Sequence, residues 1–183
     1  FGLPAGLSAG LRIHATTSSW TQTTLDPHTN LLRHTTEAMS AVLGGADSLT
    51  VAPFDSLYAE ANDFSARLAR NLSVLLREEA SLGRVQDPAA GSYYLETLTD
   101  QLAQEAWTLF QRMEAAGGLP AVRGQLVEEI KAMATETFRR IANGQQVVVG
   151  TNRFQNRDER FSFHPKKLLR SAAFDVTRAT YPT

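Results

Sequence analysis

The sequence predicts an α/β fold built from parallel strands and crossover helices. Short strand-like runs alternate with longer amphipathic helices, and the order of strand then helix occurs three times. Prolines and paired glycines stand where these elements would begin or end. A closed (β/α)8 barrel needs eight strands, so three such units cannot form one. The alternatives are an open sheet, part of a barrel whose first strands lie upstream, or a sheet completed by another chain.

The first unit pairs a short strand with a capped helix. Leu11–Ala15 alternates apolar and polar side chains, which is typical of a strand. Asp26 can cap a helix whose first residue is Pro27, and Gly44-Gly45 ends that helix. The residues that keep helical spacing within it are Leu31, Leu32, Thr35, Ala38, Met39 and Val42.

The second unit begins with a strand at Ser48–Val51 and continues with a helix capped by Asn62 or Asp63. That helix ends at Gly83, and residues 84–86 predict a third, minimal strand. The predicted buried face of the helix consists of Phe64, Leu68, Leu72, Leu75 and Leu76.

A turn at Asp87-Pro88 opens the third helix, which ends at Gly117-Gly118. Its apolar residues recur on one helical stripe, so we expect a buried helix, with Tyr94 also in the core. The stripe consists of Leu98, Leu102, Ala103, Trp107, Leu109, Phe110 and Met113.

The pattern changes after Gly118, because the remaining chain predicts helices and an irregular arm. Pro120 begins one helix that stops at Asn143-Gly144, and residues 147–149 form an apolar run that could be extended. The other predicted segments are an irregular arm at 151–163 and a last helix from Pro165 to about Arg178. We therefore predict a division into residues 1–118, the strand–helix part, and 119–183, a helical extension and linker arm.

Composition excludes several classes of protein. A net charge of −1 gives no bulk field toward nucleic acid or anionic membrane. The absence of cysteine excludes a disulfide framework, thiolate zinc and a thiol nucleophile, and it fits a reducing, cytoplasmic location. No apolar run approaches a membrane span of about 20 residues. The first residues resemble no signal peptide and include no initiator Met, so the chain could be a fragment or a processed product.

Four stretches resemble one known family. They read TTSSWTQTTLDPHTNLLRHTTEAMSAVLGGADSLT at 16–50, DFSARLARN at 63–71, DPAAGSYYLETLTDQLAQEAWTLFQRMEAAGG at 87–118 and GTNRF at 150–154. In order and spelling they are similar to the acyl-CoA-binding barrel of the methylmalonyl-CoA mutase family. The resemblance implies the C-terminal portion of a (β/α)8 barrel, with about three strand–helix units here.

The resemblance also implies a function. The family interconverts (R)-methylmalonyl-CoA and succinyl-CoA by a radical rearrangement with adenosylcobalamin, which binds to a separate domain. Bacterial members are often heterodimers of a catalytic large subunit and a related small subunit, and this sequence looks more like the small one. The chain itself is then expected to bind no cofactor and to pair with the large subunit. Alternatives are a piece of a catalytic mutase barrel and a bare acyl-CoA-binding module.

Three departures from the catalytic family members favour the non-catalytic reading. Thr16 stands where catalytic chains have Arg before the Thr-Ser pair, and Thr50 stands where they read Ser-Leu-His. Residues 70–73 read Arg-Asn-Leu-Ser rather than Arg-Asn-Thr-Gln. In the family the Arg and His help to grip the acyl-CoA. We therefore expect weak or absent substrate binding and carry over no catalytic residue.

Thr16, Thr17 and Ser18 form the candidate substrate-binding cluster, in vestigial form. They follow the first predicted strand, where a barrel carries its site, and hydroxyls there could hold a phosphate or a pantetheine amide. A hydrogen-bonded strand end is the simpler alternative. Ser18 has no neighbouring base in the sequence, so no nucleophile is assigned.

The remaining polar clusters favour ordinary roles. Asp26-Pro27-His28 begins like the family's cobalt-ligating Asp-x-His-x-x-Gly motif but continues to Leu31 instead of Gly, so a helix cap explains it better. The four histidines lack the spacing of a metal site. An arm of arginines and phenylalanines at 153–163 favours a protein partner over nucleic acid. An isolated chain should expose barrel edges, so we predict self-association when it is purified alone.

Overall fold

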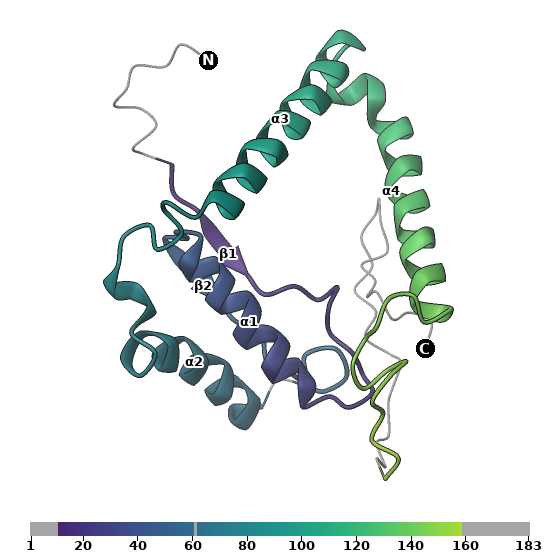
Figure 1. Cartoon of the computed structure of the whole chain (residues 1–183). Coiled ribbons are helices and arrows are strands. Elements are labelled where there is room, and N and C mark those ends of the chain that lie inside the picture. The colour runs from purple at the N-terminus through teal and green to yellow at the C-terminus, as the bar shows by residue number, and fades with distance from the viewer. Residues whose placement is uncertain (1–10, 61, 159–183) are drawn as a thin grey trace. The chain divides into compact units, whose positions relative to one another are not determined.

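The structure is a computed structural model that describes residues 11–60 and 62–158 (Figure 1). The chain forms two compact units, one made of the segment up to Pro88 together with the segment from Val148 onward, the other spanning Ala89–Val147. In chain order the elements are β1 (His14–Thr16), α1 (Thr29–Leu43), β2 (Ser48–Thr50), α2 (Asp63–Glu78), η2 (Leu82–Arg84), α3 (Tyr93–Ala115) and α4 (Leu119–Ala142).

β1 and β2 form a two-stranded parallel sheet, which confirms the predicted α/β class with a crossover helix between its strands. The register pairs His14 with Ser48 and Thr16 with Thr50. The pairing extends at both ends. Asp47 N donates to the Ile13 carbonyl at 2.9 Å before the strands, and Thr17 N donates to the Thr50 carbonyl at 3.1 Å after them. The sheet therefore has one well-defined carboxyl end, at which both strands stop together.

Helix α1 begins later than predicted. Its N-cap is His28, not Asp26, because Asp26 has a left-handed φ of 46° and its carbonyl accepts from the Thr29 N–H at 3.1 Å, in a tight turn that leads into the helix. The buried face also differs from the predicted apolar one: Asn30, His34 and Ala38 are buried, whereas Leu32 is exposed. Two polar residues on this face are inside because loop atoms satisfy their side chains, as described below.

Helix α2 carries the small hydrophobic core. Asn62 caps it as predicted, its side chain accepting from the Ser65 backbone N–H at 2.9 Å. Of the predicted buried face, Leu72 and Leu76 are buried, whereas Phe64 and Leu75 are exposed. The core cluster consists of Ala38, Leu72 and Leu76, and the residues packed against it are Leu49, Val51 and Leu82.

The predicted third strand at 84–86 is wrong. Leu82–Arg84 forms a short 3-10 helix, in which Arg84 N donates to the Ser81 carbonyl at 3.3 Å. Val85 does have an extended backbone, with φ −115° and ψ 128°. A strand also needs a neighbour to hydrogen-bond, and the only sheet in the described residues is β1–β2. Leu82 packs on the core instead, and this favours the local turn.

The end of α3 and both ends of α4 agree with the sequence prediction, whereas α3 begins at Tyr93, after a Ser92 cap that was not predicted. Ser92 caps α3, Gly117 and Gly118 adopt positive φ values of 98° and 80° after it, and Pro120 lies in the first turn of α4. The burial of α3 was predicted wrongly. No residue of α3 is buried, and Tyr94, Leu102 and Trp107 are 73%, 62% and 44% exposed. Its apolar stripe has no covering surface among the described residues.

The end of the described chain is irregular. Residues 147–149 form no strand of the sheet, although Val149 makes an isolated bridge to Arg153. The predicted last helix lies outside the described residues, as do residues 159–163 of the arm. The predicted division at residue 118 stays a prediction. The compact units group α3 with α4 instead, because contacts group neighbours in space and not family domains.

Candidate functional site

The carboxyl end of the sheet brings together two of the three positions at which the sequence departs from catalytic chains. Thr16 and Thr50 are the last residues of β1 and β2 and are register partners. Because side chains alternate along a strand, His14 and Ser48 share the same face with them. All four residues are exposed, and we call them the strand face.

His14 organises the strand face. Its Nδ1 lies 2.7 Å from Ser48 Oγ, and its Nε2 lies 3.2 Å from Thr50 Oγ1. The sequence alone gives His14 no role beyond that of a surface or capping histidine. The signal that could have identified it is its position two residues before Thr16 in an alternating run. The face offers hydroxyl and imidazole groups for hydrogen bonds to an amide or hydroxyl, but none of its four positions carries a lysine or arginine.

The predicted cluster of Thr16, Thr17 and Ser18 is divided by the structure. Thr17 is buried, and its Oγ1 accepts from the Ala52 N–H at 2.9 Å. Ser18 Oγ accepts from the Trp20 N–H at 3.1 Å. Thr17 and Ser18 therefore serve the backbone of the loops, as the alternative reading supposed, and only Thr16 lies on the strand face. Binding of a substrate by these hydroxyls stays a prediction.

Beneath the loops that follow both strands lies a set of hydrogen-bonded side chains, which we call the polar network: Gln22, Thr23, Asn30, Arg33 and His34. Asn30, at 0% exposure, donates to the carbonyls of Thr23 and Phe54 at 2.8 and 3.0 Å. Its Oδ1 accepts from the Thr23 N–H at 2.9 Å. One amide side chain thereby joins the loop after β1 to the loop after β2, and this fixes the carboxyl end of the sheet.

His34 is the buried titratable group of this network, at 1% exposure. Burial lowers its pKa, and nearby Arg33 lowers it further, while Glu37 and the Ala52 backbone act in the opposite direction. The Gln22 amide nitrogen lies 2.8 Å from Nε2; since that nitrogen can only donate, Nε2 accepts and the ring is neutral. Among the described residues Nδ1 has no partner of ordinary geometry.

Arg33 connects the network to a distant part of the chain. Its Nη1 donates to Thr23 Oγ1 and Asn30 Oδ1, both at 2.8 Å, and its Nη2 donates to the Val149 carbonyl at 2.6 Å. Burial lowers its pKa, and the carboxylates of Asp26 and Glu37 oppose this effect. The guanidinium is thus already used by protein oxygens and does not face a ligand.

The described residues form no group of three or more His, Cys, Asp or Glu side chains that could hold a metal ion. The His28 ring lies against Phe54, with centroids 5.4 Å apart, at the start of α1. A cobalt ligand on the family's motif would need Gly at the position of Leu31, so these residues do not fit that role. No helix in the described ranges is long and apolar enough to cross a bilayer.

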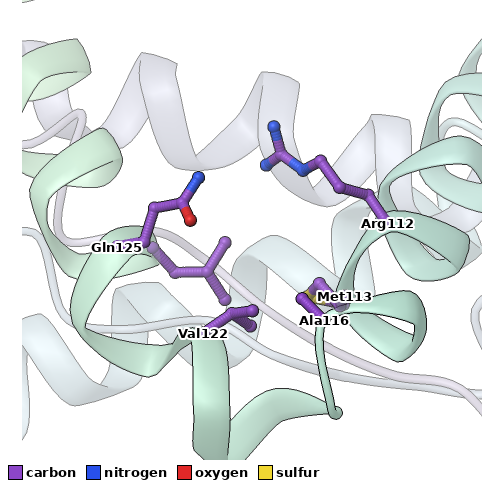
Figure 2. A pocket seen from close by; sticks show the side chains of 6 residues that line it. Arg112, Met113, Ala116, Val122 and Gln125 are labelled. Atoms are coloured by element: carbon purple, nitrogen blue, oxygen red, sulfur yellow. The ribbon is translucent and has the colours of Figure 1, made fainter.

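A small cavity lies between α3 and α4 near their connecting turn (Figure 2). Its volume is about 30 Å³, and the Arg112 guanidinium at its edge pairs with Glu129 at 2.9 Å. A volume of this size suits about one water molecule, whereas ligand pockets are typically about 300–1,000 Å³. The lining residues are Arg112, Met113, Ala116, Val122, Gln125 and Leu126. We therefore assign no ligand to it.

Comparison with known proteins gives a consistent result. The family model described as methylmalonyl-CoA mutase matches residues 1–176. The methylmalonyl-CoA mutase small subunit of Porphyromonas gingivalis is 45% identical over 151 residues, which cover 81% of this chain and 24% of that protein. The small subunit of Streptomyces virginiae is 42% identical over 161 residues, 87% of this chain and 26% of that protein.

The same stretch also matches a large subunit. The methylmalonyl-CoA mutase large subunit of Porphyromonas gingivalis is 40% identical over 157 residues, covering 85% of this chain and 22% of that protein. The chain thus spans about a quarter of the length of the curated relatives that it matches. Both subunit types share this stretch, so overall identity alone does not assign the chain to one of them.

Proposed function

Because this chain belongs to the methylmalonyl-CoA mutase family, we propose that it has the role of the small, non-catalytic subunit. In this role it pairs with a catalytic large subunit that interconverts (R)-methylmalonyl-CoA and succinyl-CoA. The existence of separate small and large subunits among its relatives supports a heteromeric assembly. Adenosylcobalamin would be held by the partner, in the cytoplasm, and the two strand–helix units here would be part of a (β/α)8 barrel.

One observation carries the non-catalytic role: Thr16 and Thr50 are opposite one another in the sheet register. By the resemblance, these positions hold Arg and His in catalytic chains, where they grip the acyl-CoA. Each cation that pairs with a phosphate or carboxylate contributes about 1.5–3 kcal/mol through a charge-assisted hydrogen bond. Two neutral hydroxyls at adjacent positions of one site therefore remove both contributions from the same ligand.

The third departure supports the same role in a different way. Leu72 stands where catalytic chains have Thr, and it is buried in the core beside Ala38 and Leu76. Arg70 and Asn71, which match the family pattern, are both exposed. The replacement therefore favours packing within this chain over a polar contact with a ligand.

Restoring the two cations tests the proposal directly. The full chain should bind a CoA ester weakly or not at all by calorimetry, and Thr16→Arg/Thr50→His should strengthen binding at least about tenfold, equivalent to about 1.4 kcal/mol. The matched control is Thr97→Arg/Thr99→His, which adds the same groups at exposed positions of α3. Equal binding by both double variants would contradict a role for the strand face.

Turnover tests the subunit assignment. The chain alone, supplied with methylmalonyl-CoA and adenosylcobalamin, should show no turnover. With a catalytic large subunit it should form an assembly of about 1:1, measurable as the native mass of the complex. Activity of the chain by itself would end the non-catalytic proposal, and failure to form a complex would end the pairing.

A second candidate function is acyl-CoA binding without catalysis. The observation that favours it is the hydrogen-bonding strand face, where His14 connects Ser48 and Thr50. This candidate predicts measurable binding of a CoA ester by the parent chain and its loss in Ser48→Ala/Thr50→Ala. These two exposed positions are better probes than Thr17→Ala, because Thr17 is buried and its hydroxyl holds the Ala52 backbone. No binding by the parent would remove this candidate.

A further inference from the structure

The segment Val148–Phe154 lies against the start of α1, although 116 positions separate Val149 from its partner Arg33. It contains the GTNRF sequence, to which the strand face gives no role. The Nη2 atom of Arg33 donates to the Val149 carbonyl at 2.6 Å, and the bond is charge-assisted because the guanidinium is ionised. Neither residue belongs to the strand face, so this contact is separate from the candidate site.

The segment has its own internal hydrogen bonds. Gly150 N donates to the Arg153 carbonyl at 2.8 Å, and the N–H groups of Thr151 and Asn152 both donate to the Val148 carbonyl at 3.1 Å. The Asn152 side chain closes the turn by accepting from the Val148 N–H at 2.7 Å. These bonds fold seven residues into one compact turn.

Gly150 fits this turn to α1 in a way that no other residue could. Its φ is +77°, and a Cβ built there would lie 2.7 Å from the Cβ of Asp26. Backbone freedom and close approach therefore both require glycine. Both Gly150 and Thr151 are buried, so the turn packs against the rest of the first compact unit.

Arg33 is held ready for this contact. Its Nη1 donates to three oxygens at 2.8 to 3.0 Å, those of Thr29 and Asn30 in the first turn of α1 and that of Thr23 in the loop before it. The planar fork then leaves Nη2 directed at Val149. A lysine has a single ammonium group and could not make both sets of bonds in this geometry.

We propose that Val148–Phe154 is a clasp that opens and closes as one unit on the start of α1, and that Arg33 is its latch. The chain leaves the first compact unit after Pro88 and returns to it at Val148. The clasp thus fixes the point at which the chain returns from the α3–α4 hairpin. This device is independent of whether the chain pairs with a catalytic subunit, so its test and those above can fail separately.

Hydrogen exchange of the full chain tests the latch. In Arg33→Met the amides of Gly150, Thr151 and Asn152 should exchange at least about tenfold faster than in the parent, because local opening becomes easier. The amide of Thr17, which donates to the Thr50 carbonyl, reports on the sheet and should be unchanged. The matched control Arg70→Met removes an exposed arginine of α2 and should leave all four amides at parental rates.

A second variant removes the fit without touching the latch. Gly150→Ala introduces both backbone strain and the contact with Asp26, so it should accelerate exchange of the Thr151 and Asn152 amides. Because both substitutions open the same clasp, the clasp amides of Arg33→Met/Gly150→Ala should exchange little faster than those of the faster single variant. Unchanged clasp exchange in Arg33→Met would overturn the inference. Equal acceleration of the Thr17 amide would also overturn it, because the clasp would then open only together with the sheet.

Discussion

The two compact units differ in which side chains they bury. In the first unit, polar side chains lie inside and each of several makes two or more hydrogen bonds, as Asn30 and Arg33 do. In the α3–α4 hairpin, apolar side chains lie outside, among them Leu102 and Tyr94. The difference shows which surfaces have their partners within the described residues and which do not. The polar groups at the carboxyl end of the sheet hydrogen-bond to one another, whereas the stripe on α3 has the pattern of a buried surface but no cover among the residues that the structure describes.

The largest effect should come from breaking the polar network at Asn30. Asn30→Leu removes three hydrogen bonds to the Thr23 and Phe54 backbones and leaves those groups buried. Each unsatisfied group costs about 1–3 kcal/mol, so the free energy of unfolding should fall by roughly 3 kcal/mol or more. Urea unfolding measures this.

Asn71→Leu, at an exposed position of α2, is the matched control and should change the free energy of unfolding by less than about 0.5 kcal/mol. Equal effects of the two substitutions would show that the polar network does not stabilise the first unit.

The same apolar substitution in both units sharpens the comparison. Leu72→Ala removes a core side chain that contacts the Ala38 and Leu76 cluster, and it should lower the free energy of unfolding by about 2–3 kcal/mol. Leu102→Ala removes a side chain that is 62% exposed, and its effect should stay below about 0.5 kcal/mol. If Leu102→Ala costs as much as Leu72→Ala, the α3 stripe is covered in solution and the contrast fails.

Protonation of His34 should produce a smaller, pH-dependent effect. Burial lowers its pKa in the folded protein below the ordinary value of 6.5, so the unfolded chain binds the proton more readily. The stabilisation is therefore complete above pH 6.5 and is lost as the pH falls from there toward the folded pKa. The unfolding free energy measured between pH 8 and 5 (about the range over which histidine changes charge) should decline on the acid side.

His34→Gln removes the titration and should flatten that decline, whereas the exposed His14→Gln should keep it. A decline of equal slope in both variants would assign the acid sensitivity to other groups.

Sequence patterns predicted the elements better than their burial. Capping residues, prolines and glycines mark the ends of helices by local chemistry, so Asn62, Pro120 and Gly117-Gly118 were placed correctly. The buried Asn30 could not be predicted, because its partners come from loops distant in the chain. An extended run such as that at Val85 becomes a strand only when a neighbour is present.

The candidate site shows the same limit. Sequence reasoning found Thr16 and Thr50 separately, through the departures from catalytic chains. It could not show that they are register partners, since this depends on the β1–β2 pairing. The role of His14 depends on the same pairing, because both of its hydroxyl partners belong to the other strand.

The smallest expected effect concerns association through the α3 stripe. Residues 11–60 and 62–158 leave the stripe uncovered, which favours weak contact between copies, so the purified chain should self-associate at high concentration, as light scattering can detect. Leu102→Glu places a charge in the middle of the stripe and should reduce this association. Gln104→Glu adds the same charge on the opposite, polar side of α3 and should not. A parent chain that stays monomeric at all concentrations would mean that the stripe needs a different surface to cover it, and association equal in both variants would place the contact elsewhere.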